Sequence, residues 1–406
     1  MTTMTTLTFC AGLSLALTVA PAVVAQGQGA QSITIRAARV LDGRGGTLAN
    51  GVVEIRGVTI LAVDQRTGPV THDLGDVTMM PGMMDVHVHM NWYFGPGGKY
   101  GERDVTAAYA ADAVLDNARR TLLAGFTTVQ SLGAASDRAL REAIASGVVV
   151  GPRLLSSLSQ IQPGNQTPDQ LRARVRSLKS DGADVVKIFA SGSIRDGGKM
   201  NVTQQQLDAL CSEARAQGLR TAVHAHSSDS IISAVRAGCT QVEHGLFADD
   251  TAIRTMKEAN VFFDPNIGLV LQNYLENKDK YLGVGNYTEE GFAFMEKAIP
   301  GLAPVFTKAL KAGLRMPLGT DAVAGAHGQN AREAVIRVKD GGQSPMDAII
   351  SATSLAAESM KLGETLGTLK TGYQADIIAV GGDPVSDITK LRDVRFVMKG
   401  GRIYKR

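Results

Sequence analysis

The sequence predicts an α/β fold: a (β/α)8 TIM barrel with a small β-sandwich domain built from both chain ends. Short β-branched runs alternate with amphipathic helical stretches in the middle of the chain, and Gly-rich β segments occupy both ends. Six of the seven histidines fall at or just after the end of an expected strand. The strands of such a barrel end at one mouth, so these histidines are expected to meet there.

Eight strands are expected in the middle of the chain. They span 84–89, 127–131, 153–157, 185–190, 220–226, 241–244, 261–265 and 315–320. Helical patterns fall between them, among them 104–124, 203–217 and 289–312. The terminal segments 26–80 and 361–406 show short strands and turns and are expected to form the sandwich, which leaves 81–360 as the catalytic barrel.

The first 25 residues predict a cleaved signal peptide. They carry no charged side chain, contain an apolar run from Leu7 and end in small residues at Ala25. The mature protein is therefore expected to be exported, periplasmic or secreted, with no stable membrane anchor, because no other stretch could span a bilayer. A loose N-terminal anchor is the alternative, since Lys and Arg are missing ahead of the apolar run.

The charge pattern bears on the kind of partner, and the cysteine content bears on a possible disulfide. The formal net charge is +3, with acids and bases mixed along the chain, which does not predict a nucleic-acid or anionic-membrane partner. The mature chain keeps Cys211 and Cys239, both on helical patterns. Two buried free thiols are expected, and a disulfide is the alternative.

Two pairs of histidines have metal-ligand spacing. His87 and His89 end the strand 84–89, and His224 and His226 end 220–226, so each pair points from one face of its strand. His244 ends the strand 241–244. Imidazoles that converge in this way are typical ligands of Zn²⁺, and Mn²⁺ or Co²⁺ could substitute.

Lys187 and Asp321 extend this set. Lys187 lies in an almost wholly apolar strand, where burial favours a neutral amine. Such an amine can add CO₂ to form a carbamate that bridges two metal ions, whereas the plainer interpretation is a lysine that reaches solvent or an acid. Asp321 follows 315–320, where it could ligate an ion and accept a proton from water, or simply cap the turn.

Together these motifs resemble the amidohydrolase superfamily. They are H-V-H at 87–89, V-V-K-I at 185–188, H-A-H at 224–226, E-H-G at 243–245, G-T-D at 319–321 and the stretch 366–376. Within this superfamily, the chain is similar to the branch of imidazolonepropionase-related and Xaa-Pro dipeptidase-like enzymes. It also resembles the exported bacterial amidohydrolases that hydrolyse ochratoxin A. The resemblance covers nearly the whole mature chain.

The resemblance implies two divalent metal ions, most simply Zn²⁺, with Lys187 carboxylated by CO₂ between them. It puts His87, His89 and Asp321 on one ion and His224 and His244 on the other. His226 is implied to contact substrate, although its spacing would equally suit a ligand. Family members also tend to form homo-oligomers.

The function implied is hydrolysis of N-acyl or aminoacyl amides of C-terminal hydrophobic amino acids, by a hydroxide that bridges the two ions. Ochratoxin A, cleaved to phenylalanine and ochratoxin alpha, would be one such substrate. A cyclic amidase or lactonase of the same superfamily is the alternative. A deaminase usually works without a bridging lysine, and a non-enzymatic exported binding protein would not need the full ligand set.

Three further residues are substrate-binding candidates near the mouth. Arg195 could hold a substrate carboxylate or be a solvated loop residue, and Ile194 beside it would add an apolar wall. His327 could touch substrate or cap a helix. The loop 157–167 is short and lacks the histidine common in relatives, so a more open mouth is expected there.

Overall fold

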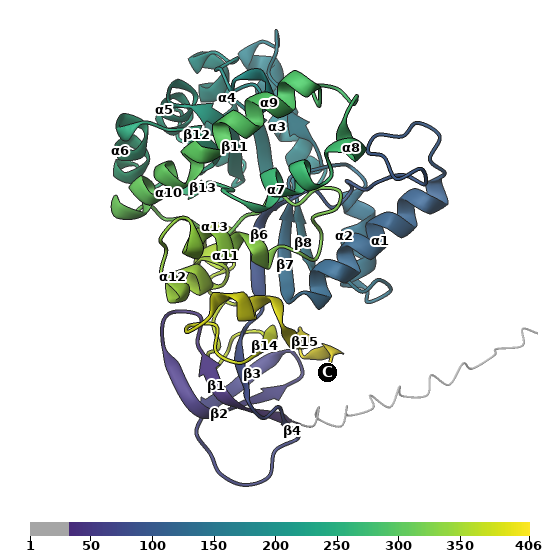
Figure 1. Ribbon diagram of the computed structural model, residues 1–406, viewed down its shortest axis with the longest axis vertical. Coiled ribbons are helices and arrows are strands. Elements are labelled where there is room, and N and C mark those ends of the chain that lie inside the picture. The colour runs from purple at the N-terminus through teal and green to yellow at the C-terminus, as the bar shows by residue number, and fades with distance from the viewer. Residues whose placement is uncertain (1–31) are drawn as a thin grey trace, which may run out of the picture. The chain divides into compact units, whose positions relative to one another are not determined.

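The computed structural model describes residues 32–406, which form a single α/β unit (Figure 1). The predicted signal peptide, residues 1–25, lies outside the described residues. Within the described range, no helix combines the length and apolar character needed to cross a membrane.

Strands from both chain ends share one eight-stranded sheet. Its order is β16-β15-β14-β5-β1-β2-β3, with β4 beside β1, and β5 pairs antiparallel with β14 to join the two ends. Both faces carry apolar side chains, such as Ile35, Met79 and Phe396 on one of them. The expected second layer of a sandwich is not confirmed, since these strands belong to one sheet. The strands are β1 (Ile33–Leu41), β2 (Thr47–Arg56), β3 (Thr59–Asp64), β4 (His72–Asp73), β5 (Val77–Pro81), β14 (Ile377–Gly381), β15 (Val394–Lys399) and β16 (Arg402–Lys405).

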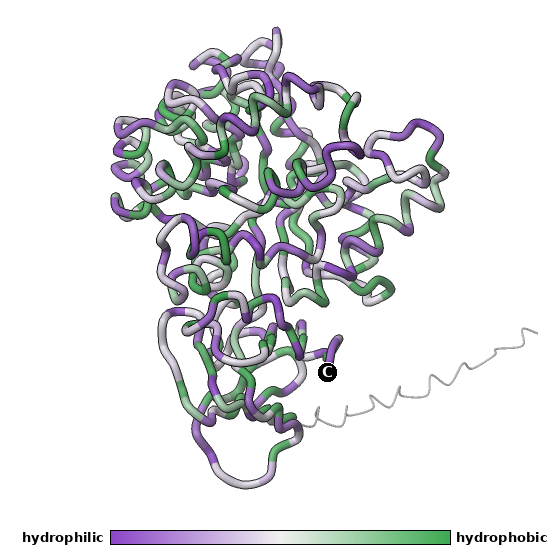
Figure 2. Tube along the Cα trace, viewed as in Figure 1, coloured by the Kyte–Doolittle hydropathy of each residue, from purple (hydrophilic) through white to green (hydrophobic). Residues whose placement is uncertain are grey.

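The middle of the chain contains two parallel sheets, ordered β6-β7-β8 and β13-β12-β11-β10-β9. Their strands are buried along almost their whole length, as expected of strands covered on both faces, and polar residues alternate with apolar ones in several of them. Figure 2 shows hydrophobic stretches along these strands and hydrophilic ones on the outer helices. The strands are β6 (Met83–Val88), β7 (Phe126–Ser131), β8 (Arg153–Ser156), β9 (Gln160–Ile161), β10 (Val185–Phe189), β11 (Arg220–Ser227), β12 (Gln241–Phe247) and β13 (Phe262–Asp264).

The expected eighth strand, 315–320, is not a regular strand. The segment is linked to β13 by the bridge Phe262↔Arg315 and to β6 by the N–H of Val86, which donates to Leu318 at 3.0 Å. Pro317 has no N–H to donate to a ladder, which accounts for the irregularity. Because the parallel strands fall into two sheets, strand pairing alone does not confirm a closed barrel.

Helices connect the parallel strands. The predicted helix 289–312 is two helices separated by a 3-10 turn, because Pro300 cannot continue the hydrogen-bond pattern of α9. Helices α7 and α8 and the short strand β9 were not predicted. The helices are α1 (Ala107–Leu123), α2 (Asp137–Ala145), α3 (Pro168–Ser180), α4 (Gln204–Ala216), α5 (Ser228–Arg236), α6 (Asp250–Glu258), α7 (Leu269–Glu276), α8 (Lys278–Tyr281), α9 (Glu289–Ala298), α10 (Leu302–Lys311), α11 (Ala331–Lys339), α12 (Pro345–Ser351) and α13 (Ser354–Ser359), with 3-10 turns η1 (Ile194–Asp196), η2 (Ile299–Gly301) and η3 (Ile388–Arg392).

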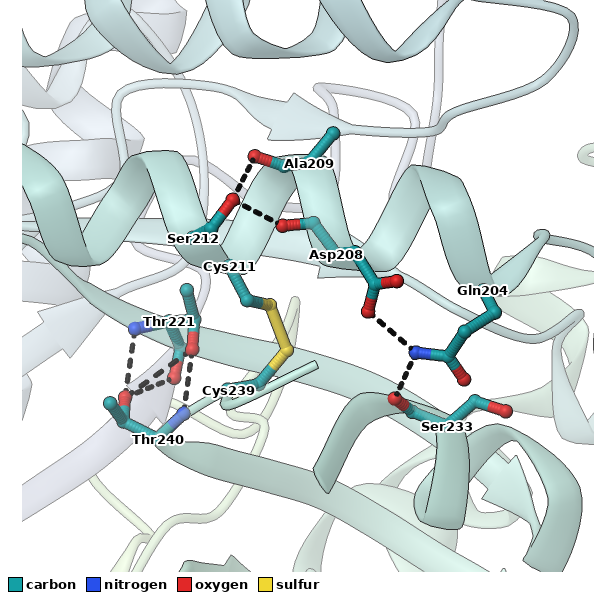
Figure 3. The surroundings of a disulfide bond; sticks show 9 residues. All are labelled: Gln204, Asp208, Ala209, Cys211, Ser212, Thr221, Ser233, Cys239 and Thr240. Atoms are coloured by element: carbon teal, nitrogen blue, oxygen red, sulfur yellow. Dashed lines mark hydrogen bonds between the residues drawn. A yellow bond between two sulfur atoms is a disulfide. The ribbon is translucent and has the colours of Figure 1, made fainter. Parts of the chain in front are cut away.

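The expectation of two free thiols is wrong: Cys211 and Cys239 form a disulfide between α4 and the turn before β12 (Figure 3). Their Cα atoms are 5.2 Å apart although 28 residues separate them in sequence. Closing a loop of that length stabilises a fold by roughly 3–4 kcal/mol in the chain-entropy description. Nearby, Thr221 and Thr240 each accept the other's backbone N–H at 2.8 Å, which fixes the starts of β11 and β12.

Candidate metal centre

The predicted ligands gather around one cavity of about 140 Å³ at the C-terminal ends of the parallel strands. Side chains from β6, β10, β11, β12 and the segment after Thr320 reach it because all these strands run in the same direction. Ile194, Arg195 and His226 also line it, whereas His327 does not. The predicted ligands in its lining are His87, His89, Lys187, His224, His244 and Asp321.

Three of these residues form a compact donor group. Oδ1 of Asp321 lies 3.0 Å from Nε2 of His89 and 3.4 Å from Nε2 of His87. All three donor atoms lie within 4.8 Å of one another. Two ligands held about 2.1 Å from a tetrahedral ion stand roughly 3.4 Å apart, so this group has the spacing of a divalent metal site.

The remaining candidates surround Lys187. Its Nζ lies 3.3 Å from Nε2 of His87. The rings of His224 and His244 are 4.6 Å apart, and that of His244 is 5.3 Å from that of His87. Nε2 of His224 lies 3.1 Å from the Gly192 carbonyl and can donate to it, which leaves Nδ1 as its free lone pair. These residues supply nitrogen donors beside the first group but no further carboxylate.

Burial dominates the electrostatics. It lowers the pKa of Lys187, although the carboxylates of Glu243, Asp321 and Asp264 oppose the shift. It also lowers the pKa values of His224 and His244. The nitrogen groups are thereby biased toward their neutral forms, which are the forms that bind metals and react with CO₂.

For Asp321 and His87, neighbouring charges outweigh the effect of burial on the pKa. Burial tends to raise the pKa of Asp321, but the positive character of His87 and His89 lowers it below its usual value. For His87, burial and Lys187 act to lower the pKa, but the carboxylates of Asp321 and Glu243 raise it to about 9. The site therefore holds an ionised Asp321 among imidazoles.

Two buried acids orient His87 and were not singled out from the sequence. Oε2 of Glu243 lies 2.8 Å from Nδ1 of His87, and Oδ2 of Asp264 lies 3.7 Å from it. Nδ1 can therefore donate to Glu243 while Nε2 faces the cavity, the arrangement that fixes the tautomer of a metal-ligating histidine. Asp264 is itself held by Arg337 at 3.0 Å.

A third missed acid, Asp85, lies on β6 itself, two residues before His87. It accepts hydrogen bonds from Oγ1 of Thr320 at 2.6 Å and from Nδ2 of Asn330 at 2.7 Å. It thereby ties β6 to the turn that carries Asp321. The signal was available in the sequence: an acid inside an apolar strand, the same signal that pointed to Lys187.

Arg195 presents an unpaired cation to the cavity. Its guanidinium lies 3.9 Å from the ring centroid of Tyr287, and its Nε donates to Oδ1 of Asn286 at 3.0 Å. Asn286 is oriented by Asp196, which accepts from its Nδ2 at 2.6 Å. Within residues 32–406 no carboxylate forms an ion pair with Arg195 at 4.0 Å or less, so its terminal N–H groups can bind an anion.

The remaining candidates lie in different surroundings. Ile194 is buried in η1. The His226 ring stacks on that of His244 at 5.0 Å, and burial, with the charge of Arg195, lowers its pKa to about 3. His327 is buried outside the cavity lining, and burial lowers its pKa to about 4. His327 lies close enough to His89 for that imidazole to lower its pKa further, but it does not line the cavity, so a substrate contact for it stays a prediction.

The chain belongs to the amidohydrolase family, whose model matches residues 78–404. This confirms the resemblance inferred from the motifs. Together with the fold and the donor set, this membership identifies the chain as an amidohydrolase, a hydrolase acting on amide bonds.

Among curated proteins, the chain is similar to the ochratoxinase of Aspergillus niger, with 28% identity over 451 residues, covering 97% of this chain and 91% of that protein. Among solved structures, it is similar to a Xaa-Pro dipeptidase with methionine bound in the active site, with a TM-score of 0.83 and 29% identity. That match covers 93% of this chain and all of the other. The crystal structure of A. niger ochratoxinase shares the fold, with a TM-score of 0.79, 24% identity, and 93% and 96% of the two chains covered.

Proposed function

We propose that this protein is a binuclear metal-dependent amidohydrolase that releases hydrophobic amino acids from their N-acyl or aminoacyl amides. The observation that carries the proposal is the donor triangle of His87, His89 and Asp321, with the amine of Lys187 3.3 Å from one corner. Burial lowers the pKa of Lys187 in spite of the nearby carboxylates, which favours a neutral or carboxylated amine beside the imidazoles.

The proposed ligand assignment is the one that the family resemblance implies, and the spacing of His87, His89 and Asp321 supports its first half. His87, His89 and Asp321 would hold one ion and His224 and His244 the other, with Lys187, carboxylated by CO₂, between them. A nitrogen and oxygen donor set of this kind suits Zn²⁺. Such ions would supply Lewis acidity and lower the pKa of water toward about 7.

Asp321 is the proposed proton carrier. Its pKa is lowered, so it is an ionised acceptor at neutral pH, and its Oδ1 faces the cavity between two imidazoles. It can take a proton from the attacking water and pass it to the leaving amide nitrogen. The neutral His226 on β11 can donate a hydrogen bond to the substrate carbonyl without adding a charge.

The preference for a hydrophobic C-terminal residue is supported by the wall of the cavity. Arg195 offers free N–H groups for the α-carboxylate, and Phe189, Ile194, Leu246 and Val270 line the space beside it. The related dipeptidase holds methionine, a free hydrophobic amino acid, in its active site. Ochratoxin A, an amide of phenylalanine, is one substrate of this class.

The proposal extends to architecture and location. Segment 315–322 hydrogen-bonds to β6 on one side and bridges β13 on the other, which supports closure of the parallel strands as a (β/α)8 barrel. The disulfide between Cys211 and Cys239 supports export through the predicted leader, because such bonds persist in oxidising compartments. We further propose a homo-oligomer, on family grounds alone.

The test is a screen of the zinc-loaded protein and of Asp321→Asn. N-acyl amino acids, Xaa-Pro dipeptides, ochratoxin A, cyclic amides and lactones form the panel. We expect the wild type to release hydrophobic amino acids. For Asp321→Asn we expect kcat to fall about 10³-fold or more, because this variant loses both the general base and a metal ligand. Turnover of only the lactones or cyclic amides would contradict the proposed substrate class.

A further inference from the structure

A second and much larger cavity adjoins the metal centre. It is a groove of about 960 Å³ between α2, α3 and the loops that follow β6, β7 and β8. We refer to it as the α2–α3 groove. Side chains that line it include Trp92, Arg138, Gln160, Gln162 and Arg174.

The volumes of the two cavities indicate which part of the substrate each could hold. Small-molecule sites usually enclose about 300–1,000 Å³. The cavity at the metal centre, at about 140 Å³, is below this range, whereas the α2–α3 groove is near its upper end. The metal cavity can take the scissile amide and part of an amino acid, so a bulky acyl group has to extend elsewhere.

Trp92 and Gln160 connect the two spaces, since both residues line both cavities. The Trp92 ring lies 5.2 Å from that of His89. Gln160 pairs with Lys187 in the β9–β10 register, and its Nε2 donates to the Leu132 carbonyl at 2.7 Å. The groove therefore begins directly beside the candidate ligands.

The walls of the groove define what it could bind. Nη2 of Arg174 donates to Oγ of Ser159 at 2.7 Å, which holds the guanidinium in place. Arg138 is paired with Asp181 at 3.6 Å, but within residues 32–406 no carboxylate pairs with Arg174 at 4.0 Å or less. The groove thus has one uncompensated positive charge, together with the half-buried indole of Trp92, which stacks on Tyr100 at 4.8 Å, at its entrance.

We propose that the α2–α3 groove binds the acyl part of the substrate, and that Arg174 favours aromatic acyl groups with an anionic oxygen. The inference rests on the proposed amidohydrolase function and adds the acyl specificity to it. Trp92 contacts the aromatic ring at the junction of the two cavities, and Arg174 binds the anionic oxygen further along the groove.

The first test compares three amides of phenylalanine: N-acetyl, N-benzoyl and N-(4-carboxybenzoyl). A charge-assisted hydrogen bond in an exposed groove is worth about a tenfold preference. We expect Arg174→Gln to lower kcat/KM for the carboxybenzoyl amide about tenfold relative to the acetyl amide. The matched control is Arg172→Gln on the same helix, where Arg172 pairs with Asp169 outside the groove, and it should leave the ratio unchanged.

The second test needs no turnover. Trp92 is the single tryptophan of the chain, so its fluorescence reports directly on the groove entrance. Titration with 4-carboxybenzoate, the acyl product of the same amide, should quench it saturably, with an apparent Kd that rises about tenfold in Arg174→Gln but not in Arg172→Gln.

The outcomes separate the two proposals. If no amide is hydrolysed but the quenching depends on Arg174, the proposed function fails and the groove stands as a site for aromatic carboxylates. If Arg174→Gln changes all three amides equally, or none of them, and leaves the titration unaltered, the acyl site is refuted while hydrolysis itself stands.

Discussion

Replacing Glu243 with methionine is expected to weaken metal binding without unfolding the protein. The carboxylate is fully buried, and its Oε2 is the hydrogen-bond acceptor 2.8 Å from Nδ1 of His87. Methionine fills a similar volume but cannot accept that hydrogen bond. His87 would then lose the partner that keeps its Nε2 directed at the cavity.

Two independent estimates give the magnitude. A buried donor left without an acceptor costs about 1–3 kcal/mol. Loss of the hydrogen-bond acceptor on the second ring nitrogen of a metal-ligating histidine typically weakens metal binding about 10–100-fold. This corresponds to about 1.4–2.7 kcal/mol. Glu243→Gln should be milder, because its amide oxygen can still accept from His87. Gln241, whose Oε1 has no hydrogen-bond partner, can turn to accept the new N–H group.

The assay is competition between the protein and a chelator for Zn²⁺ or Co²⁺, with metal content measured after dialysis. Denaturant unfolding of the chelator-treated proteins checks that each variant is folded. Glu258→Met, which alters an exposed glutamate at the end of α6, is the control. Wild-type affinity in Glu243→Met would refute the orienting role of Glu243.

Three further predictions concern other residues. Lys187→Ala should reduce bound metal from two ions to one or none and abolish turnover; two ions retained by elemental analysis would contradict the bridge. His327 is charged in the unfolded state below pH 6.5 but stays neutral in the folded state down to about pH 4, so it should cost up to about 3 kcal/mol of stability as the pH falls through that window. Chelator-treated His327→Gln should show a flatter dependence of unfolding free energy on pH, and an unchanged slope would contradict this. Cys211→Ser should lower the unfolding free energy by roughly 3 kcal/mol and expose one titratable thiol at Cys239, whereas two thiols in the wild type would exclude the disulfide.

The order of strands and the main site residues could be predicted from the sequence because each reflects local chemistry. His87, His89 and Lys187 interrupt runs of buried apolar residues, and such interruptions are costly unless they are functional. Once parallel strands are assumed, their C-terminal ends must meet, and the three-dimensional site follows from one-dimensional positions.

Features that depend on contacts between distant segments could not be predicted in this way. Cys211 and Cys239 each look like an ordinary buried thiol, and only the packing of α4 near β12 brings them together. The pairing of β9 with β10 involves two residues of a loop that has no strand pattern. Proline effects were predictable in principle: Pro300 divides one expected helix, and Pro317 disrupts one expected strand.

The backbone at His244 explains how two adjacent residues serve one centre. In a regular strand Glu243 and His244 would face opposite sides, and one would be lost to the site. Here His244 has a φ of 70° and Gly245 a φ of 59°, beside a shift in the β11–β12 register. That left-handed turn lets Glu243 contact His87 while the His244 ring lies 5.3 Å from the same imidazole.

Asp321 shares this property, with a φ of 49°. A left-handed conformation costs a residue with a side chain roughly 1–2 kcal/mol, and neither residue is a glycine. Both strained positions are proposed ligands in irregular segments, His244 within β12 and Asp321 after Thr320, where regular pleating would direct the side chain elsewhere. The surrounding hydrogen bonds, such as those from Thr320 to Asp85, hold the strained turn in place. The strain therefore follows from where the donor atoms have to be, and a regular strand at either position would be more stable but would leave the centre without a ligand.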